Sequence, residues 1–382
     1  MAFPSNKLPH IGTTIFTTMS QLAAENGAIN LGQGFPGFPV DSELINLVTA
    51  AMKSGHNQYA PMPGVPVLRE RIAQKMRLKW EVDYDPQAEI TITAGASQAI
   101  FTAIGALIQP GDEVILFAPA YDCYAPAVAL NGGKVHWIEL TYPDFSIPWE
   151  EVYAAVNDRT RLIMMNNPHN PTGNVWAKED TDRMAELVQS TGIYLISDEV
   201  YEHIVFDHHK QHSMALYPAI QDKTMLVYSF GKTFHATGWK LGYAIGPKDW
   251  MAEFRKQHQF NVFTCNAPFQ YAIAAYMEDS NRYDLISPMY QLKRDLINEF
   301  VPKNTFEVIP TNGTYFQLLK YVGQSSGADV ELAKLWTVAN QITLIPISVF
   351  YPGQKDNKVF RLCFAKEDKE LKQAGEVLTS IQ

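Results

Sequence analysis

An alternation of short apolar runs with helix-like stretches, from about residue 90 to residue 246, constrains the fold more than any other feature. The apolar runs have the length and composition of buried β-strands. They occupy residues 89–95, 113–119, 134–140, 161–167, 193–199, 224–230 and 241–246. Helix-like stretches such as 97–108 and 178–192 separate most of them. Because buried strands joined by helices form a mostly parallel sheet covered on both faces, we predict an α/β fold with a doubly wound sheet.

The two ends of the chain differ from this central part. Residues 1 to about 46 are punctuated by glycine and proline, and the first helix is expected to begin near Asp41 and Ser42. After about residue 280, helices alternate with short strand-like runs at 315–321, 342–348 and 358–365. We therefore predict a large domain over 47–280 and a smaller α+β domain formed by 1–46 together with 281–382.

Charge and cysteine usage limit the class of protein. A formal net charge of −9 and the lack of a basic run argue against binding to nucleic acid. Cys123, Cys265 and Cys363 are too far apart for a metal-ligand pattern and too few for a disulfide framework, which favours a reducing compartment. The first 16 residues lack the layout of a signal peptide, and no apolar stretch reaches the ~18–20 residues that cross a bilayer. We expect a soluble, cytoplasmic protein that binds no membrane.

Polar and glycine residues follow the predicted strands where ligands of open α/β sheets bind, at the strands' carboxyl ends. The "GAS" turn at 95–97 leads from a strand into a helix, where free backbone N–H groups suit a phosphate. Asp198 could cap a helix or pair with a cationic ring nitrogen. Lys232 could reach solvent, or it could have a pKa lowered by burial and act as a Schiff-base nucleophile.

Together, these motifs resemble a known family. "NPTG" around Asn170, "SDEVY" with Asp198 and Tyr201, and "SFGKTF…GWKLG" with Lys232 match the order and spacing of the class I/II aminotransferases of fold type I, which depend on pyridoxal 5′-phosphate. The likeness runs from "INLGQGFPGFP" to "RLCFAK", and "NQYAPMPGVPVLRERIA" adds to it. Within the class, the chain is similar to the bacterial methionine aminotransferases and to the kynurenine/glutamine branch.

The resemblance implies a set of residues for the cofactor. Lys232 would form the Schiff base and transfer the proton, and Asp198 would pair with the pyridinium nitrogen. Asn170 and Tyr201 would hydrogen-bond the phenolic oxygen of the ring, and Tyr121 would stack on its face. The phosphate would be bound by Gly95, Ala96, Ser97, Ser229, Lys240 and, across a homodimer interface, Tyr59.

The resemblance also implies a substrate site. Arg361 would bind the α-carboxylate bidentately, next to Asn170, and Gly34 would let the N-terminal segment close over it. Phe16 and Phe35, with Tyr59 and Phe263 contributed by the second subunit, are candidates for the wall around the substrate side chain, although each phenylalanine could equally be ordinary core. Because no second arginine stands in a family position, methionine, aromatic amino acids or glutamine are favoured over aspartate as amino donors to a 2-oxo acid.

Several features point elsewhere or carry no assignment. "GQGFPG" at 32–37 matches a dinucleotide-binding pattern, but Pro36 and Pro39 obstruct the helix that it requires. The class usually has arginine at Lys240, and His235 receives no role. The "DHHKQH" run at 207–212 shows no firm ligand pattern, so no metal site is predicted.

Three hypotheses about the activity stay open. The first is an aminotransferase that moves the amino group of methionine, or of an aromatic amino acid or glutamine, to a 2-oxo acid, with a kynurenine aminotransferase as its alternative. The second is a cysteine-conjugate β-lyase on the same scaffold, which the motifs do not separate from the first. The third is a non-catalytic ligand-sensing protein that kept the aminotransferase fold, as in regulators with a fused DNA-binding module, and the presence of Lys232 with its surrounding motifs argues against it. The resemblance begins within the first dozen or so residues, so we expect no such module.

Overall fold

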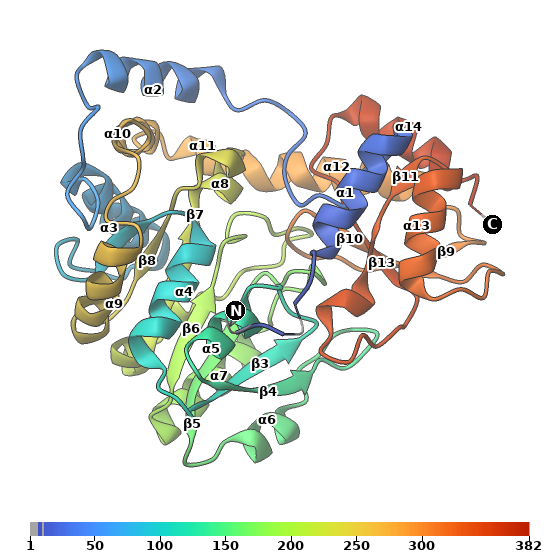
Figure 1. The fold of residues 1–382 in the computed structure, drawn as a ribbon. Helices are drawn as coiled ribbons and strands as arrows, with labels where there is room; N and C mark the ends of the chain where they lie inside the picture. The colour runs from blue at the N-terminus through green and yellow to red at the C-terminus, as the bar shows by residue number, and fades with distance from the viewer. Residues whose placement is uncertain (1–6, 10, 382) are drawn as a thin grey trace, which may run out of the picture.

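The structure, a computed structural model, describes residues 7–9 and 11–381. Residues 1–6 and 10, which belong to the predicted small domain and to the segment judged to lack a signal peptide, lie outside this part, as does residue 382. Figure 1 shows a large sheet with its helices, and beside it a smaller assembly of strands and helices drawn mostly in orange and red. Within the described ranges, every helix is too short or too polar to span a membrane.

The large sheet of the described chain has seven strands in the order β2-β8-β7-β6-β5-β3-β4. Strand β8 runs antiparallel to β2 and β7, and the other neighbouring pairs are parallel. The strands are β2 (Ile90–Thr93), β3 (Glu113–Ala118), β4 (Lys134–Glu139), β5 (Thr160–Asn166), β6 (Tyr194–Asp198), β7 (Thr224–Ser229) and β8 (Gly242–Ile245). The prediction of a mostly parallel sheet is confirmed, with strand ends within two residues of those expected.

Helices cover both faces of this sheet because alternate strand residues face opposite sides. Val114 and Ile115 of β3, for example, belong to two different apolar clusters. Helices α4 (Ala96–Leu107) and α9 (Lys248–Asn261) pack on one face through residues such as Ile100 and Phe254. The opposite cluster receives residues from α3 (Pro66–Trp80), α6 (Trp149–Ala155), α7 (Lys178–Thr191) and α10 (Ala267–Tyr276).

A second, antiparallel sheet has the order β12-β13-β10-β9. It consists of β9 (Phe306–Ile309), β10 (Phe316–Tyr321), β12 (Ile345–Pro346) and β13 (Val359–Cys363), with β1 (Ile29–Asn30) and β11 (Ile342–Thr343) paired nearby. Helix α1 (Ile15–Asn26) packs on α13 (Asp329–Ala339), so the start of the described chain lies beside its last third (Figure 1). Helices α12 (Ile286–Phe300) and α14 (Asp368–Leu378) pack against each other.

The prediction that the first helix begins near Asp41 was wrong, because α1 precedes it. Helix α1 buries only a narrow face, Met19 and Ala23, which gives little periodic signal among the nearby glycines and prolines. Helix α2 (Ser42–Lys53) does begin as expected, with the Asp41 carboxylate accepting a 2.8 Å bond from the Glu43 N–H. It packs on α10, and the predicted domain boundary at residue 46 falls inside it.

Candidate active site

A cavity of about 270 Å³ lies where the strand ends of the large sheet meet β13 and the N-terminal segment. It is lined by most of the residues predicted to form a site. The predicted residues that line it are Phe16, Gly34, Phe35, Gly95, Ala96, Ser97, Tyr121, Asn170, Asp198, Tyr201, Ser229, Lys232, Lys240 and Arg361. Residues from both ends of the chain thus meet those of the central sheet around one space.

Tyr59 and Phe263 do not line this cavity. Their rings meet edge-on with centroids 5.2 Å apart, and the two residues are 82% and 44% exposed. Tyr59 borders a separate surface hollow together with Met52, Thr264 and Asn266. Their contribution to a site across a subunit interface therefore stays a prediction.

Lys232 follows β7 on the short helix α8 (Phe230–Thr233), and its amine lies deep in the cavity. The amine donates to the Tyr315 hydroxyl at 2.6 Å and to the Gly34 carbonyl at 3.1 Å. Burial lowers the pKa of Lys232 to about 8, because a charged ammonium is poorly solvated there. More of the amine is therefore uncharged near neutral pH than in an exposed lysine, and this part is available as a nucleophile or base.

Asp198 ends β6 and is 4% exposed. Its carboxylate accepts a 2.6 Å bond from the Tyr124 hydroxyl and a 3.3 Å bond from the Val200 N–H, and both donors are neutral. Burial raises the pKa of Asp198 to about 6, because these two bonds only partly replace water. A cation placed against this carboxylate would remove most of the cost of its burial.

The start of α4 has uncapped backbone N–H groups beside an ammonium. Gly95 there has φ 79°, a conformation that favours glycine, and no side chain caps the first N–H groups of the helix. A Cβ on Gly95 would lie 3.3 Å from the Lys240 amine, so the ammonium sits directly beside the helix start. Strand β8 also approaches closely, since a Cβ on Gly242 would lie 3.1 Å from the Ala96 nitrogen. A helix N-terminus next to an ammonium is suited to a phosphate.

Arg361 lies on β13 and is 2% exposed. Its guanidinium donates to the Asn170 side-chain oxygen at 2.8 Å and to the Gly32 carbonyl at 3.3 Å, and its buried Nε has no partner. The ring centroids of Phe316 and Phe350 lie 3.9 and 5.0 Å from the guanidinium carbon. Arg361 is therefore held rigidly and keeps N–H groups for a carboxylate that enters the cavity.

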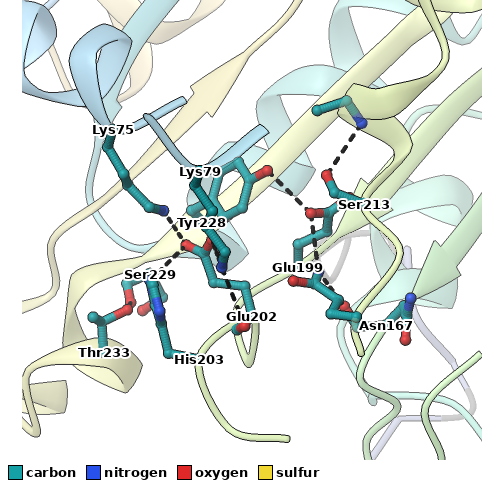
Figure 2. A network of polar contacts seen from close by, with 12 residues as sticks. Lys75, Lys79, Asn167, Glu199, Glu202, His203, Ser213, Tyr228, Ser229 and Thr233 are labelled. Carbon is teal, nitrogen blue, oxygen red and sulfur yellow. Dashed lines mark hydrogen bonds and ion pairs between the residues drawn. The ribbon is translucent and has the colours of Figure 1, made fainter. Parts of the chain in front are cut away.

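The segment that carries Asp198 and Tyr201 also carries two buried glutamates, Glu199 and Glu202, which do not line the cavity. Figure 2 shows Glu202 between Lys75 and Lys79, and Glu199 reached by Tyr228. Glu199 also accepts bonds from the Ser197 hydroxyl at 2.9 Å and the Met214 N–H at 3.0 Å. Both buried glutamates are well satisfied by donors from α3, β7 and the following loop. The network anchors the backbone on which Asp198 and Tyr201 stand.

Sequence reasoning missed several residues that line the cavity or contact its lining. Asn166 accepts a 2.7 Å bond from the Asn170 N–H and so fixes the "NPTG" loop, and Tyr124 binds Asp198. Tyr315, which directly precedes β10 of the other sheet, contacts Lys232. Tyr124 and Asn166 stand within or next to motifs already singled out, in "YDCY" and "NNPHNPTG". Tyr315 had no such local signal.

His235, which received no role, packs beneath the lysine loop. Its Nδ1 lies 2.9 Å from the Tyr290 hydroxyl, and its ring meets that of Phe38 edge-on at 5.1 Å. It is not among the residues that line the cavity. Its φ of 57° is left-handed, so the hydrogen bond and the ring contact hold a turn that few side chains adopt.

Comparison with known proteins agrees with this geometry. Residues 26–378 match the family model for aminotransferase class I and II. The chain belongs to this family. It is 43% identical over 379 residues to methionine aminotransferase of Escherichia coli (strain K12), covering 99% of this chain and 98% of that protein. It is 32% identical over 420 residues to kynurenine–oxoglutarate transaminase of Dictyostelium discoideum, covering 99% and 96%.

A solved structure of the family has nearly the same fold. The crystal structure of an Escherichia coli protein with an identified methionine aminotransferase function superposes with a TM-score of 0.97 at 42% identity, covering 100% of both chains. The predicted fold type and enzyme class are therefore confirmed. Aminotransferases of this class use pyridoxal phosphate.

The residues around the cavity fit this cofactor. Lys232 offers a partly uncharged amine for its aldehyde, and Asp198 is a buried carboxylate whose hydrogen-bond partners are neutral, suited to a cationic ring nitrogen. The start of α4 beside Lys240 is suited to its phosphate. When bound there, pyridoxal phosphate supplies an electron-accepting ring that carries the amino group between the two acids.

Proposed function

We propose that this aminotransferase takes the amino group from methionine, or from an aromatic amino acid or glutamine, and passes it to a 2-oxo acid by a ping-pong mechanism. The observation that carries this proposal is Arg361, the one arginine among the described residues that line the cavity. A single fixed guanidinium binds one carboxylate, and the rings of Phe16, Phe35 and Phe316 line the same space. This supports a substrate with one carboxylate and a neutral side chain.

The proposed roles follow from the contacts of each residue. The Lys232 amine moves a proton at the substrate Cα, and the Asp198 carboxylate holds the cationic end of the cofactor ring. Burial raises the pKa of Tyr201, so its phenol stays protonated and can donate a hydrogen bond to the cofactor together with the Asn170 amide. Gly95, Ala96, Ser97, Ser229 and Lys240 bind phosphate, Tyr121 stacks on the ring, and Gly34, Phe16 and Arg361 bind substrate.

A kynurenine aminotransferase is the second candidate, favoured by the 32% identity to a kynurenine–oxoglutarate transaminase over 99% of this chain. Kynurenine also has one carboxylate and an aromatic side chain, so the same arginine and the same rings would accept it. A β-lyase of cysteine conjugates would need no different binding groups, because it differs only in what leaves after the proton is removed.

A substrate panel tests these candidates. The purified protein, saturated with pyridoxal phosphate, is given methionine, phenylalanine, glutamine, kynurenine and aspartate, each with several 2-oxo acids, and a cysteine conjugate alone. We expect methionine to yield new amino acid fastest and aspartate slowest. Pyruvate and ammonia from the conjugate would identify a lyase instead. Aspartate as the preferred donor would overturn the proposal.

The variant Lys232→Ala provides the control for this panel. Because the variant lacks the nucleophilic amine, we expect turnover to fall by at least about 10⁴-fold. The visible absorption of the cofactor bound to the wild type should also shift or disappear. Equal absorption spectra in the variant and the wild type would remove Lys232 from its proposed role.

We further propose a homodimer with shared sites in the cytoplasm. The exposed pair Tyr59 and Phe263 supports an apolar contact with a second subunit, and three scattered free cysteines support a reducing compartment. Sedimentation at the 43.0 kDa mass of a single chain would contradict the dimer. The division into 47–280 and 1–46 with 281–382 stays a prediction.

A further inference from the structure

Tyr315 contacts the amine of Lys232, although no sequence motif pointed to this tyrosine. It precedes β10 in the second sheet, its side chain is fully buried, and its hydroxyl is 2.6 Å from both the Lys232 amine and the Gly34 carbonyl. The amine and the carbonyl are themselves 3.1 Å apart. Three polar groups from three distant parts of the chain thus form a closed triangle at the wall of the cavity, which Gly34 and Lys232 line.

Donor and acceptor roles in this triangle are fixed by the chemistry of the groups. The Gly34 carbonyl can only accept, so the Tyr315 O–H donates to it. With its hydrogen used there, the Tyr315 oxygen can only accept from the Lys232 amine. An uncharged amine has two N–H bonds and one lone pair. When its two N–H groups point to the Tyr315 oxygen and the Gly34 oxygen, the lone pair faces away from both acceptors.

The positions of the two acceptors are tightly constrained. The Tyr315 ring packs against Tyr201, Tyr290 and Phe316, with centroids 5.2, 5.7 and 4.9 Å away, which fixes the direction of its hydroxyl. A Cβ on Gly34 would lie 2.9 Å from the tip of the Phe316 ring, so the backbone there can approach this closely only as glycine.

We propose that the Tyr315 hydroxyl and the Gly34 carbonyl form a resting site for the Lys232 amine, which holds it in the cavity with its lone pair free whenever it is not bound to the cofactor. This inference rests on the proposed function, in which the amine must leave the cofactor when substrate takes its place. The amine then accepts the proton that leaves the substrate Cα, becomes an ammonium, and later returns that proton. Tyr315 is accordingly a positioning residue that orients the base, and it transfers no proton itself.

The charges around the amine explain why orientation is needed in addition to burial. Burial lowers the pKa of Lys232, and the cations Arg361 and Lys240 act in the same direction, against Cys363 and the carboxylate of Asp198. These groups set how much amine is uncharged but not where its lone pair points. Only directed hydrogen bonds do that, and Tyr315 and Gly34 supply the two that Lys232 makes in the described structure.

The test compares Tyr315→Phe with Tyr290→Phe. Tyr290 is a matched control because it is equally buried and neighbours Tyr315, while its hydroxyl bonds to His235 and not to Lys232. The first readout uses the apoenzyme. The rate at which it captures pyridoxal phosphate is followed by visible absorption across pH, and the rate rises as the Lys232 amine loses its proton.

An acceptor stabilises an ammonium more than an amine, so removing the Tyr315 oxygen should lower the pH midpoint of capture by about half to one unit. Tyr290→Phe should keep the wild-type midpoint. An unchanged midpoint in Tyr315→Phe, or the same shift in both variants, would overturn the proposal. If Tyr315→Phe does not fold, fluorotyrosine at position 315 replaces it. Its weaker acceptor should shift the midpoint in the same direction by less, and no shift would again overturn the proposal.

The second readout is a single turnover with an accepted amino donor that carries deuterium at Cα. At saturating donor, Tyr315→Phe should react about 10- to 100-fold more slowly, with a larger isotope effect and a nearly unchanged half-saturating concentration of donor. An unchanged maximal rate with a raised half-saturating concentration would instead indicate lost binding and overturn the assignment. If the wild type accepts no amino donor, the proposed function fails, and the capture experiment still decides whether Tyr315 positions the amine.

Discussion

The two sides of one short segment, residues 198–203, each carry a buried carboxylate, and the two carboxylates differ in their partners. On the cavity side, Asp198 has only neutral hydrogen-bond donors, and burial raises its pKa to about 6. On the far side, Glu202 is equally buried but lies between Lys75 and Lys79 (Figure 2). Those two lysines outweigh the effect of burial and hold the pKa of Glu202 well below its usual range. The same backbone thus carries one carboxylate that makes no ion pair with the described residues, Asp198, and one that pairs with two lysines, Glu202.

The difference distinguishes a structural charge from a functional one. A buried carboxylate that is paired with cations of the same chain contributes to the stability of the fold. A buried carboxylate without such a pair is a candidate to bind a cationic ligand. Glu202 needs nothing beyond the chain, and Asp198 is suited to the cationic ring of the cofactor. We therefore expect changes on the far side to affect stability first and changes on the cavity side to affect cofactor chemistry first.

The largest expected effect on stability comes from Glu202→Gln. The change leaves two lysines, one of them fully buried, without their counter-ion, so the free energy of unfolding should fall by about 3–5 kcal/mol. Urea denaturation measures it. Glu139→Gln is the control, because the Glu139–Lys355 ion pair is half exposed and should contribute no more than about 1 kcal/mol. Equal losses in the two variants would mean that the buried network is no more important than a surface pair.

The next effect, smaller and of opposite sign, is expected from Asp198→Asn in the apoenzyme. Folding raises the pKa of Asp198 from 3.8 to about 6, so the folded wild type holds its proton more tightly than the unfolded chain. The wild type should therefore lose up to about 3 kcal/mol of unfolding free energy as pH rises from 4 to 6, and the variant should not lose this part. Above pH 6 the variant should be the more stable protein.

Unfolding of both apoproteins across pH measures this difference directly, because titrations that the two share cancel. The comparison should then be repeated with pyridoxal phosphate bound. If the cofactor supplies the missing cation, the advantage of the variant should shrink or reverse. An apo wild type whose stability relative to the variant does not change between pH 4 and 6 would show that Asp198 is already compensated within the chain.

The sequence predicts those parts of the site that lie in short motifs, and it does not predict contacts between residues far apart in the chain. Asp198, Asn170 and Lys232 stand in short motifs at strand ends, and all three line the cavity as expected. The contacts that complete the site join residues far apart in the chain: 74 positions separate Tyr124 from Asp198, 83 separate Tyr315 from Lys232, and 127 separate Lys75 from Glu202. A single sequence carries no signal for such pairs, because each of these residues could pack ordinarily in a core.

The smallest effect in this comparison is expected from Lys240→Ala. This variant tests whether Lys240 affects the affinity for the cofactor without affecting the cofactor's chemistry. Lys240 is exposed and has a left-handed φ of 51°, which places its amine beside Gly95 at the start of α4. As a point charge open to water, it should contribute at the low end of a charge-assisted hydrogen bond, so Kd for pyridoxal phosphate should rise about tenfold. Equilibrium dialysis measures this change.

Lys248→Ala is the matched control, because Lys248 is also exposed and its 3.8 Å ion pair with Asp85 lies away from the cavity. The spectrum of the bound cofactor should be the same in both variants and in the wild type, since neither change touches Lys232 or Asp198. A normal Kd in Lys240→Ala would mean that the helix start binds the phosphate without it. A changed spectrum would mean that Lys240 acts on the chemistry through its charge near Lys232. Cations would then influence the buried groups on both sides of the segment at 198–203, and the contrast between Asp198 and Glu202 would be weaker.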